Sequence, residues 1–126
     1  MKARETAARL KRFMADEKAR KVSDLEQMIR EFKGVAFDLD RQIKAEEERT
    51  GIRDANHFAY STFAKSAAQR RDNLRASAAE LRVKLEAAVK DRDEAAAQHA
   101  RAATPESREE LRGRHRITGN PATAMR

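Results

Sequence analysis

Apolar residues recur at alternating steps of three and four along two stretches of the chain. The first stripe comprises Val22, Leu25, Ile29, Phe32, Ala36, Leu39 and Ile43, and the second comprises Leu74, Ala78, Leu81, Leu85 and Ala88. This heptad period places each stripe on one side of a helix, and a single apolar seam of this kind is buried against another helix. The pattern therefore predicts two helices that pack on each other along their seams.

The boundaries of the two helices follow from residues that interrupt the period. The first helix is expected at about residues 4–50, and the second at about residues 61–103. Pro105 ends the second helix in this prediction, because the residue before a proline is pushed out of helical geometry. Two arms of similar length with a short connection favour an antiparallel pair.

The connection is expected at residues 51–60, where the heptad period is lost. Gly51 suits the left-handed conformation that often follows a helix end, and Ser61 or Thr62 is a suitable N-cap for the next helix. Phe58 and Tyr60 are expected to fold back and close the open end of the seam.

These elements define the predicted fold class, which is all-α. It is an antiparallel two-helix coiled-coil hairpin over residues 1–104, followed by a disordered, basic C-terminal tail over residues 105–126. Folding the arms about the middle of the loop pairs Phe32 with Ala78. The predicted coiled-coil seam residues are Val22, Leu25, Ile29, Phe32, Leu39, Ile43, Leu74, Leu81 and Leu85.

Three bulky residues near the N-terminus, Leu10, Phe13 and Met14, do not share the register of the later stripe. A register shift near residues 14–22 would reconcile them with it, because an insertion of three or four residues in a heptad pattern changes the local supercoil. Folding the arms about the middle of the loop sets these three side chains opposite Ala95–Ala97, with Ala100, of the second helix.

The net charge of +7 is unevenly distributed. Residues 1–21 carry eight Lys or Arg against three acids, and residues 105–126 carry five against three, whereas residues 22–104 carry fifteen of each sign. An antiparallel pair brings the two basic ends to one tip, which would attract an acidic protein surface, nucleic acid or lipid. With 39% charged and 5% aromatic residues, the chain has the composition of a long helix rather than of a globular core.

The sequence carries no recognisable catalytic or cofactor-binding motif. It has no cysteine, and its three histidines, His57, His99 and His115, are scattered, so no metal site is expected. The carboxylate runs Glu46–Glu48 and Asp91–Glu94 are expected to be solvated, since a catalytic pair needs a cleft that shifts its pKa. We expect a non-enzymatic protein without cofactors.

Partner contacts are predicted at Arg4, Arg9, Lys11 and Arg12, from charge placement alone. Nucleic-acid binding usually adds stacking aromatics or a groove-reading helix, and neither is apparent, so no nucleic-acid partner is expected. The alternative is a basic coiled coil that binds nucleic acid or an acidic membrane surface, and a self-associating coil is a third possibility. No stretch approaches the ~20 apolar residues that cross a bilayer, and no signal-peptide core is apparent, so we expect an intracellular protein.

Several segments carry a family resemblance. They are His57–Leu74 with Ala45–Ile52 before it, and the opening Met1–Thr6 with Leu10–Phe13 and Asp16–Lys18. Over about residues 1–90, the chain resembles the flagellar export protein FliJ family of alphaproteobacteria. It departs from that family after about Arg92, where the helical pattern fades.

The resemblance implies a coiled-coil stalk or adaptor of the flagellar type III protein export apparatus. Its implied partners are the flagellar export ATPase, the export gate protein and export chaperones. The implied location is cytoplasmic, peripheral to the membrane at the flagellar base. A stalk of this kind needs a stiff rod and a charged surface, and the sequence predicts both.

Overall fold

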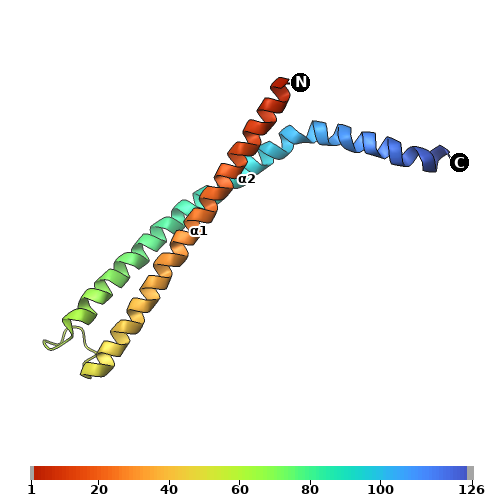
Figure 1. The fold of residues 1–126 in the computed structure, drawn as a ribbon. Coiled ribbons are helices and arrows are strands. Elements are labelled where there is room, and N and C mark those ends of the chain that lie inside the picture. The colour runs from red at the N-terminus through yellow and green to blue at the C-terminus, as the bar shows by residue number, and fades with distance from the viewer. Residues whose placement is uncertain (1, 125–126) are drawn as a thin grey trace. The chain divides into compact units, whose positions relative to one another are not determined.

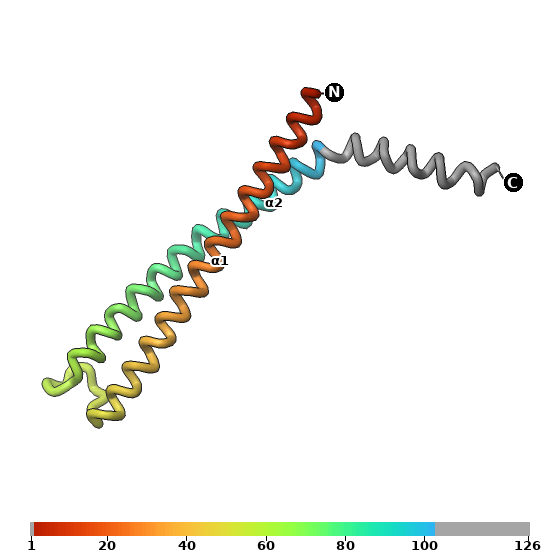
Figure 2. The backbone as a smooth tube through the Cα atoms, in the orientation of Figure 1, coloured from red at the N-terminus to blue at the C-terminus, as the bar shows by residue number. Residues whose placement is uncertain are grey.

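The structure, a computed structural model, describes the backbone of residues 2–124 and the side chains of residues 2–102. It contains two helices, α1 (Lys2–Thr50) and α2 (Thr62–Ala124) (Figure 1). The chain divides into two compact units, Lys21–Ala88 and a second unit made of Met1–Arg20 and Val89–Arg126. In the first unit the two helices lie side by side on the same side of the loop, and their chain directions are antiparallel (Figure 2). The predicted all-α antiparallel hairpin is therefore confirmed.

The seam of the unit Lys21–Ala88 is asymmetric. On α1 large and small apolar residues are buried, namely Val22, Leu25, Ile29, Ala36, Leu39 and Ile43, whereas on α2 the buried residues are Ala64, Ala67, Ala78 and Ala88. Phe32, Leu74, Leu81 and Leu85 are half-buried at predicted seam positions. Two helices alone cannot enclose every large side chain, and at the loop end of the seam Leu39 and Ile43 of α1 cluster with the small residues Ala64 and Ala67 of α2. Each buried Leu or Ile contributes about 1.5–3 kcal/mol.

A contact across this unit reports the register of the two helices. Arg71 Nη1 donates a hydrogen bond to Asp40 Oδ1 at 2.8 Å. Counting the same number of residues forward from Phe32 and back from Ala78 leads to Asp40 and Arg70. The observed partner of Asp40 is the next residue, so the contact agrees with the predicted pairing of Phe32 with Ala78 to within one residue.

The loop begins and ends at the caps that the sequence predicts. Gly51 has a φ of +75°, and its N–H donates to the carbonyl oxygen of Glu47 at 2.8 Å, which caps α1. Ser61 Oγ accepts the N–H of Ala64 at 3.2 Å and is the N-cap of α2. Tyr60 packs against the apolar cluster at this end of the seam, as predicted. Phe58 does not: its exposure is 96%, so its predicted role in closing the seam is wrong.

The second unit keeps the heptad phase of the hairpin. Ala8, Ala15 and Lys18 are half-buried on α1, whereas Leu10, Phe13 and Met14 are exposed. The predicted register shift, which would bring these three residues into the seam, is therefore wrong, although Met14 lines a groove to which Ala95 of α2 also contributes. A heptad phase set by the buried stripe that begins at Val22 is carried along a continuous helix, and changing it would require local over- or underwinding.

Helix α2 extends beyond its predicted end near residue 103 and includes Pro105. Proline lacks the backbone N–H that a helix uses, at a cost of about 3 kcal/mol, so it disfavours a helical position without forbidding it. The predicted basic tail, residues 105–126, lies outside the part of the chain whose side chains the structure describes.

Candidate functional site

An apolar patch lies on the N-terminal segment of α1. Leu10, Phe13 and Met14 have exposures of 58%, 60% and 46%. Residues three and four apart are neighbours on a helix surface, so these three side chains form one patch. We call it the Leu10 patch. Large apolar side chains gathered at one place on a surface are typical of a protein or membrane contact.

The predicted cations Arg4, Arg9, Lys11 and Arg12 are all exposed on the same segment, but they do not lie on one face. Arg9 is four residues before Phe13, and Lys11 is three residues before Met14, so these two cations flank the Leu10 patch on opposite sides. Arg4 lies on the same side of the helix as Lys11, two turns earlier. Arg12 points away from the patch, and it is the weakest of the four predicted contacts.

The flanking cations are available for a partner. Among the residues whose side chains are described, none forms an ion pair with Arg9 or Lys11. Their neighbours are engaged: Arg20 Nη1 lies 3.0 Å from Glu17 Oε1, and Lys18 Nζ lies 4.0 Å from Asp91 Oδ2. The patch therefore offers apolar surface that a partner can cover, next to two positive charges that form no ion pair within the described side chains. Interface hot spots combine the same two features.

A shallow groove of about 250 Å³ adjoins the patch at Met14. Its other lining residues are Lys18 on α1 and Asp91, Glu94, Ala95 and Gln98 on α2. The groove is open and polar on its α2 side, and it offers no enclosed space for a small molecule. It extends the surface that a macromolecular partner could cover next to the Leu10 patch.

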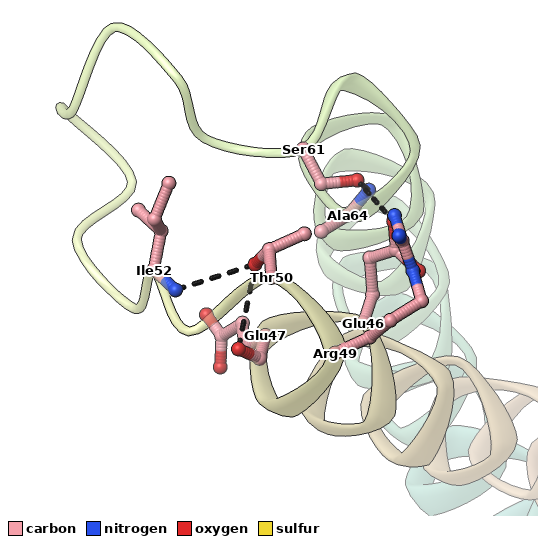
Figure 3. Close-up of polar contacts among 7 residues, drawn as sticks. All are labelled: Glu46, Glu47, Arg49, Thr50, Ile52, Ser61 and Ala64. Carbon is pink, nitrogen blue, oxygen red and sulfur yellow. Dashed lines mark hydrogen bonds and ion pairs between the residues drawn. The ribbon is translucent and has the colours of Figure 1, made fainter.

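The loop end of the hairpin holds a polar network that ties the loop to both helices. Ser61 donates its hydroxyl proton to Glu46 Oε1 at 3.0 Å, and Glu46 also accepts hydrogen bonds from Arg49 (Figure 3). Thr50 Oγ1 accepts the N–H of Ile52 at 3.3 Å. Glu46 and Glu47 are half-buried, so the prediction that this carboxylate run is solvated is wrong for two of its members.

The charges in this network shift the pKa values of the groups involved. Hydrogen bonds from Arg49, and then from Ser61, lower the pKa of Glu46. Tyr60 donates its phenolic proton to Glu47 Oε2 at 2.7 Å, and this hydrogen bond raises the pKa of Tyr60. Both shifts favour the protonation states that these hydrogen bonds require, which are an ionised Glu46 and a protonated Tyr60. The network stabilises the turn, and Glu47 also lines an open groove of about 240 Å³ with Lys44, Glu48 and Arg53.

The tip of the loop presents an aromatic pair to solvent. The rings of His57 and Phe58 stack with their centroids 4.7 Å apart. His57 Nδ1 accepts the N–H of Ala59 at 3.0 Å, and Asp54 Oδ1 accepts the N–H of Asn56 at 2.9 Å, so local hydrogen bonds shape the tip. Phe58 is exposed at this tip.

No other chemistry is evident in the part of the chain that the structure describes. Within it, no three His, Cys, Asp or Glu side chains gather where they could hold a metal ion. Likewise, no helix there is long and apolar enough to cross a membrane. No family model, curated protein or solved structure matches this chain.

The heptad phase of the sequence contains a signal for the Leu10 patch. Leu10, Phe13 and Met14 are out of phase with the seam, which is compatible either with a register shift in the helix or with a second apolar face. The simpler consequence is that they point away from the seam. Apolar residues that are out of phase with a strict heptad stripe mark a second face of the helix.

Proposed function

We propose that the chain is a non-enzymatic stalk or adaptor of the flagellar type III protein export apparatus. The proposal rests on the family resemblance over about residues 1–90, and it is supported by a hairpin whose thin seam leaves no interior for a substrate. Under this proposal the N-terminal segment binds the export ATPase ring, and the protein links that ring to the export gate and chaperones at the cytoplasmic face of the membrane.

One observation carries the proposal beyond resemblance, namely the Leu10 patch between Arg9 and Lys11. The patch is exposed although its side chains are large and apolar, with an exposure of 60% for Phe13. A stalk must bind neighbouring subunits through its outer surface, because a two-helix seam is already used in holding the rod together. Apolar anchors supply affinity in such a contact, and the flanking cations orient it against an acidic partner.

The test is binding to the flagellar export ATPase of the same cell. The full chain is expected to co-elute with the ATPase at about 150 mM salt, where purely electrostatic contacts are weakened, and to raise its ATP turnover. Substitution Leu10→Ala with Phe13→Ala is expected to weaken binding by at least about tenfold, since each removes an interface anchor.

The matched control is Met28→Ala with Val35→Ala, which also removes two exposed apolar side chains from α1. It is expected to change ATPase binding by less than about twofold. Equal losses in both variants would remove the Leu10 patch from the proposal. Failure of the unmodified chain to bind, with its helicity intact by circular dichroism, would overturn the proposed function.

The second candidate is a basic coiled coil that binds nucleic acid or an acidic membrane surface. The excess of positive charge in residues 1–21, eight basic against three acidic residues, favours it. Such binding would need no partner protein, and its affinity would fall by orders of magnitude between about 50 and about 200 mM salt. A protein contact anchored by the Leu10 patch would depend much less on salt.

A further inference from the structure

A groove on one flank of the hairpin Lys21–Ala88 has no part in the function proposed above. It has a volume of about 330 Å³ and is lined by Lys33 of α1 and by a face of α2 that includes Arg75, Ala79, Arg82 and Val83. These α2 residues are spaced by three, four and seven positions, so they share one face of the helix. From Arg75 to Glu86 the lining follows α2 for about three turns.

The floor of the groove is apolar and shallow. It contains Ala78, which is buried in the seam, and Ala79 beside it. Val83 stands next to them with an exposure of 67%. Small residues let the backbone of another helix approach closely, and a valine at the edge gives that helix an apolar ridge to pack against.

The rim of the groove is positively charged. Lys33 directly follows the seam residue Phe32, and Arg75 and Arg82 directly follow the seam residues Leu74 and Leu81. In antiparallel coiled coils such flanking positions meet across the helices and usually carry opposite charges. Here they carry the same charge, with Glu86 as the acidic residue of the lining. Among the residues whose side chains are described, none forms an ion pair with Lys33, Arg75 or Arg82.

We propose that this groove binds an acidic amphipathic helix of another protein. This partner helix packs as a third helix of the coiled coil, with its apolar side chains against Ala78, Ala79 and Val83. Its carboxylates lie against the positive charges of Lys33, Arg75 and Arg82. This is the helix-in-groove mode of recognition, in which apolar anchors and flanking charges act together.

Other occupants fit these features less well. The lining has no aromatic side chain on which a base could stack, as single-stranded nucleic acids require. A membrane surface accepts protruding large apolar side chains, whereas this floor is made of alanine methyl groups. A second copy of the same groove would bring six cations together, so self-association through this face is disfavoured.

The test uses a fluorescein-labelled helical peptide of about three heptads, with leucines on one face and glutamates beside them. Its binding to the full chain is followed by fluorescence anisotropy at about 150 mM salt. Saturable binding is expected, and a peptide with glutamine in place of every glutamate is expected to bind at least about tenfold more weakly. No saturable binding below about 100 µM, or equal binding of both peptides, would overturn the proposal.

Two charge-matched variants locate the binding. The rim variant, Arg75→Glu with Arg82→Glu, reverses the charge of two rim residues. The control variant, Arg70→Glu with Lys84→Glu, makes the same change of net charge at exposed positions elsewhere on α2. The rim variant is expected to weaken peptide binding by at least about tenfold, and the control by less than about twofold. Circular dichroism checks that both remain helical. Equal weakening in the two would mean that only net charge matters and would overturn the proposal.

A labelled single-stranded DNA of similar charge is measured in parallel. If the rim variant loses DNA binding and keeps peptide binding, the groove is a nucleic-acid site and the proposal fails. Because the groove lies within Lys21–Ala88, Leu10→Ala with Phe13→Ala is expected to leave peptide binding unchanged. Failure of the groove proposal and failure of the proposed ATPase contact are therefore distinguishable.

Discussion

Arg71 lies at a seam position of α2, and its guanidinium is held by Asp40 of α1. Arg71 Nη1 donates to Asp40 Oδ1 at 2.8 Å, and Arg71 Nε donates to Asp72 Oδ1 at 3.1 Å. The side-chain exposure of Arg71 is 21%, so its aliphatic stem crosses the thin core while its charged group reaches carboxylates at the edge. An ion pair thus occupies a level of the hairpin where the heptad pattern calls for an apolar residue.

This pair sets a first prediction, because partly buried ion pairs are often replaceable by apolar residues. Arg71→Leu is expected to stabilise the hairpin by about 1 kcal/mol, since leucine buries more apolar surface in the seam. Asp40→Asn is expected to lower the thermal midpoint, because it leaves the Arg71 cation less well compensated. Thermal unfolding followed by circular dichroism measures both. A lower midpoint for Arg71→Leu would show that the ion pair itself stabilises this level.

Stability is expected to fall at acid pH through two carboxylates. The hydrogen bond from Arg71 lowers the pKa of Asp40 below its ordinary 3.8, and hydrogen bonds from Arg49 and Ser61 lower that of Glu46 below its ordinary 4.5. Because both values are lower in the folded state, the stabilisation is full above these ordinary values and is lost as pH falls through the folded-state values. Thermal midpoints between about pH 7 and about pH 2 measure this loss.

The double variant Asp40→Asn with Glu46→Gln is the control for the acid dependence. It is expected to start from a lower midpoint at neutral pH and to lose less as the pH falls, because neither amide titrates. Parallel curves for the variant and the unmodified chain would show that other groups govern acid unfolding.

The asymmetric seam predicts a contrast between neighbouring residues of α1. Ile29→Ala is expected to cost about 2–3 kcal/mol, because Ile29 has an exposure of 6% and its loss leaves a cavity in the seam. Met28→Ala is expected to change stability by less than about 0.5 kcal/mol, since Met28 has an exposure of 41%. Urea unfolding measures both free energies. Similar costs would mean that α1 is rotated relative to the arrangement described here.

Two glycines are expected to respond to alanine with opposite signs. Gly51 has a φ of +75°, so Gly51→Ala is expected to destabilise the hairpin by about 1 kcal/mol. Gly34 is inside α1, and a Cβ there would meet no atom within 4 Å, so Gly34→Ala is expected to stabilise by about 0.5–1 kcal/mol. A Cβ at Gly51 would also meet open space, so its cost comes from the backbone alone. Thermal unfolding of the two variants under the same conditions checks the signs.

The register can be tested by cross-linking, because the chain has no cysteine of its own. Phe32→Cys with Ala78→Cys is expected to form a disulfide under mild oxidation, which requires Cα atoms within about 7 Å of each other. Phe32→Cys with Leu85→Cys is displaced by one heptad, about 10 Å along the helix, and is expected not to cross-link within one chain. Cross-linking of the second pair alone would show a different register.

Much of the fold was predictable because it depends on local features. The heptad period marked Val22, Leu25 and Ile29 as seam residues, and all three are buried. Gly51 and Ser61 marked the ends of the helices through the backbone conformations and hydrogen bonds that they favour. For the candidate site, the charge pattern predicted contacts at Arg9 and Lys11, which are exposed, whereas the predicted packing of Phe13 in the seam is wrong because Phe13 is exposed.

What the sequence by itself determined is the pair of helices, the antiparallel hairpin and its seam, because hydrophobic period and capping residues act within a few turns of chain. The tertiary structure decided which apolar residues remain exposed to solvent instead of being buried in the seam. The phase carried from Val22 exposes the Leu10 patch, and hydrogen bonds from Tyr60 and Ser61 to Glu47 and Glu46 close the loop without Phe58. The two loop hydrogen bonds join residues 13 and 15 positions apart in the chain, and neither the heptad period nor a capping residue acts between such positions.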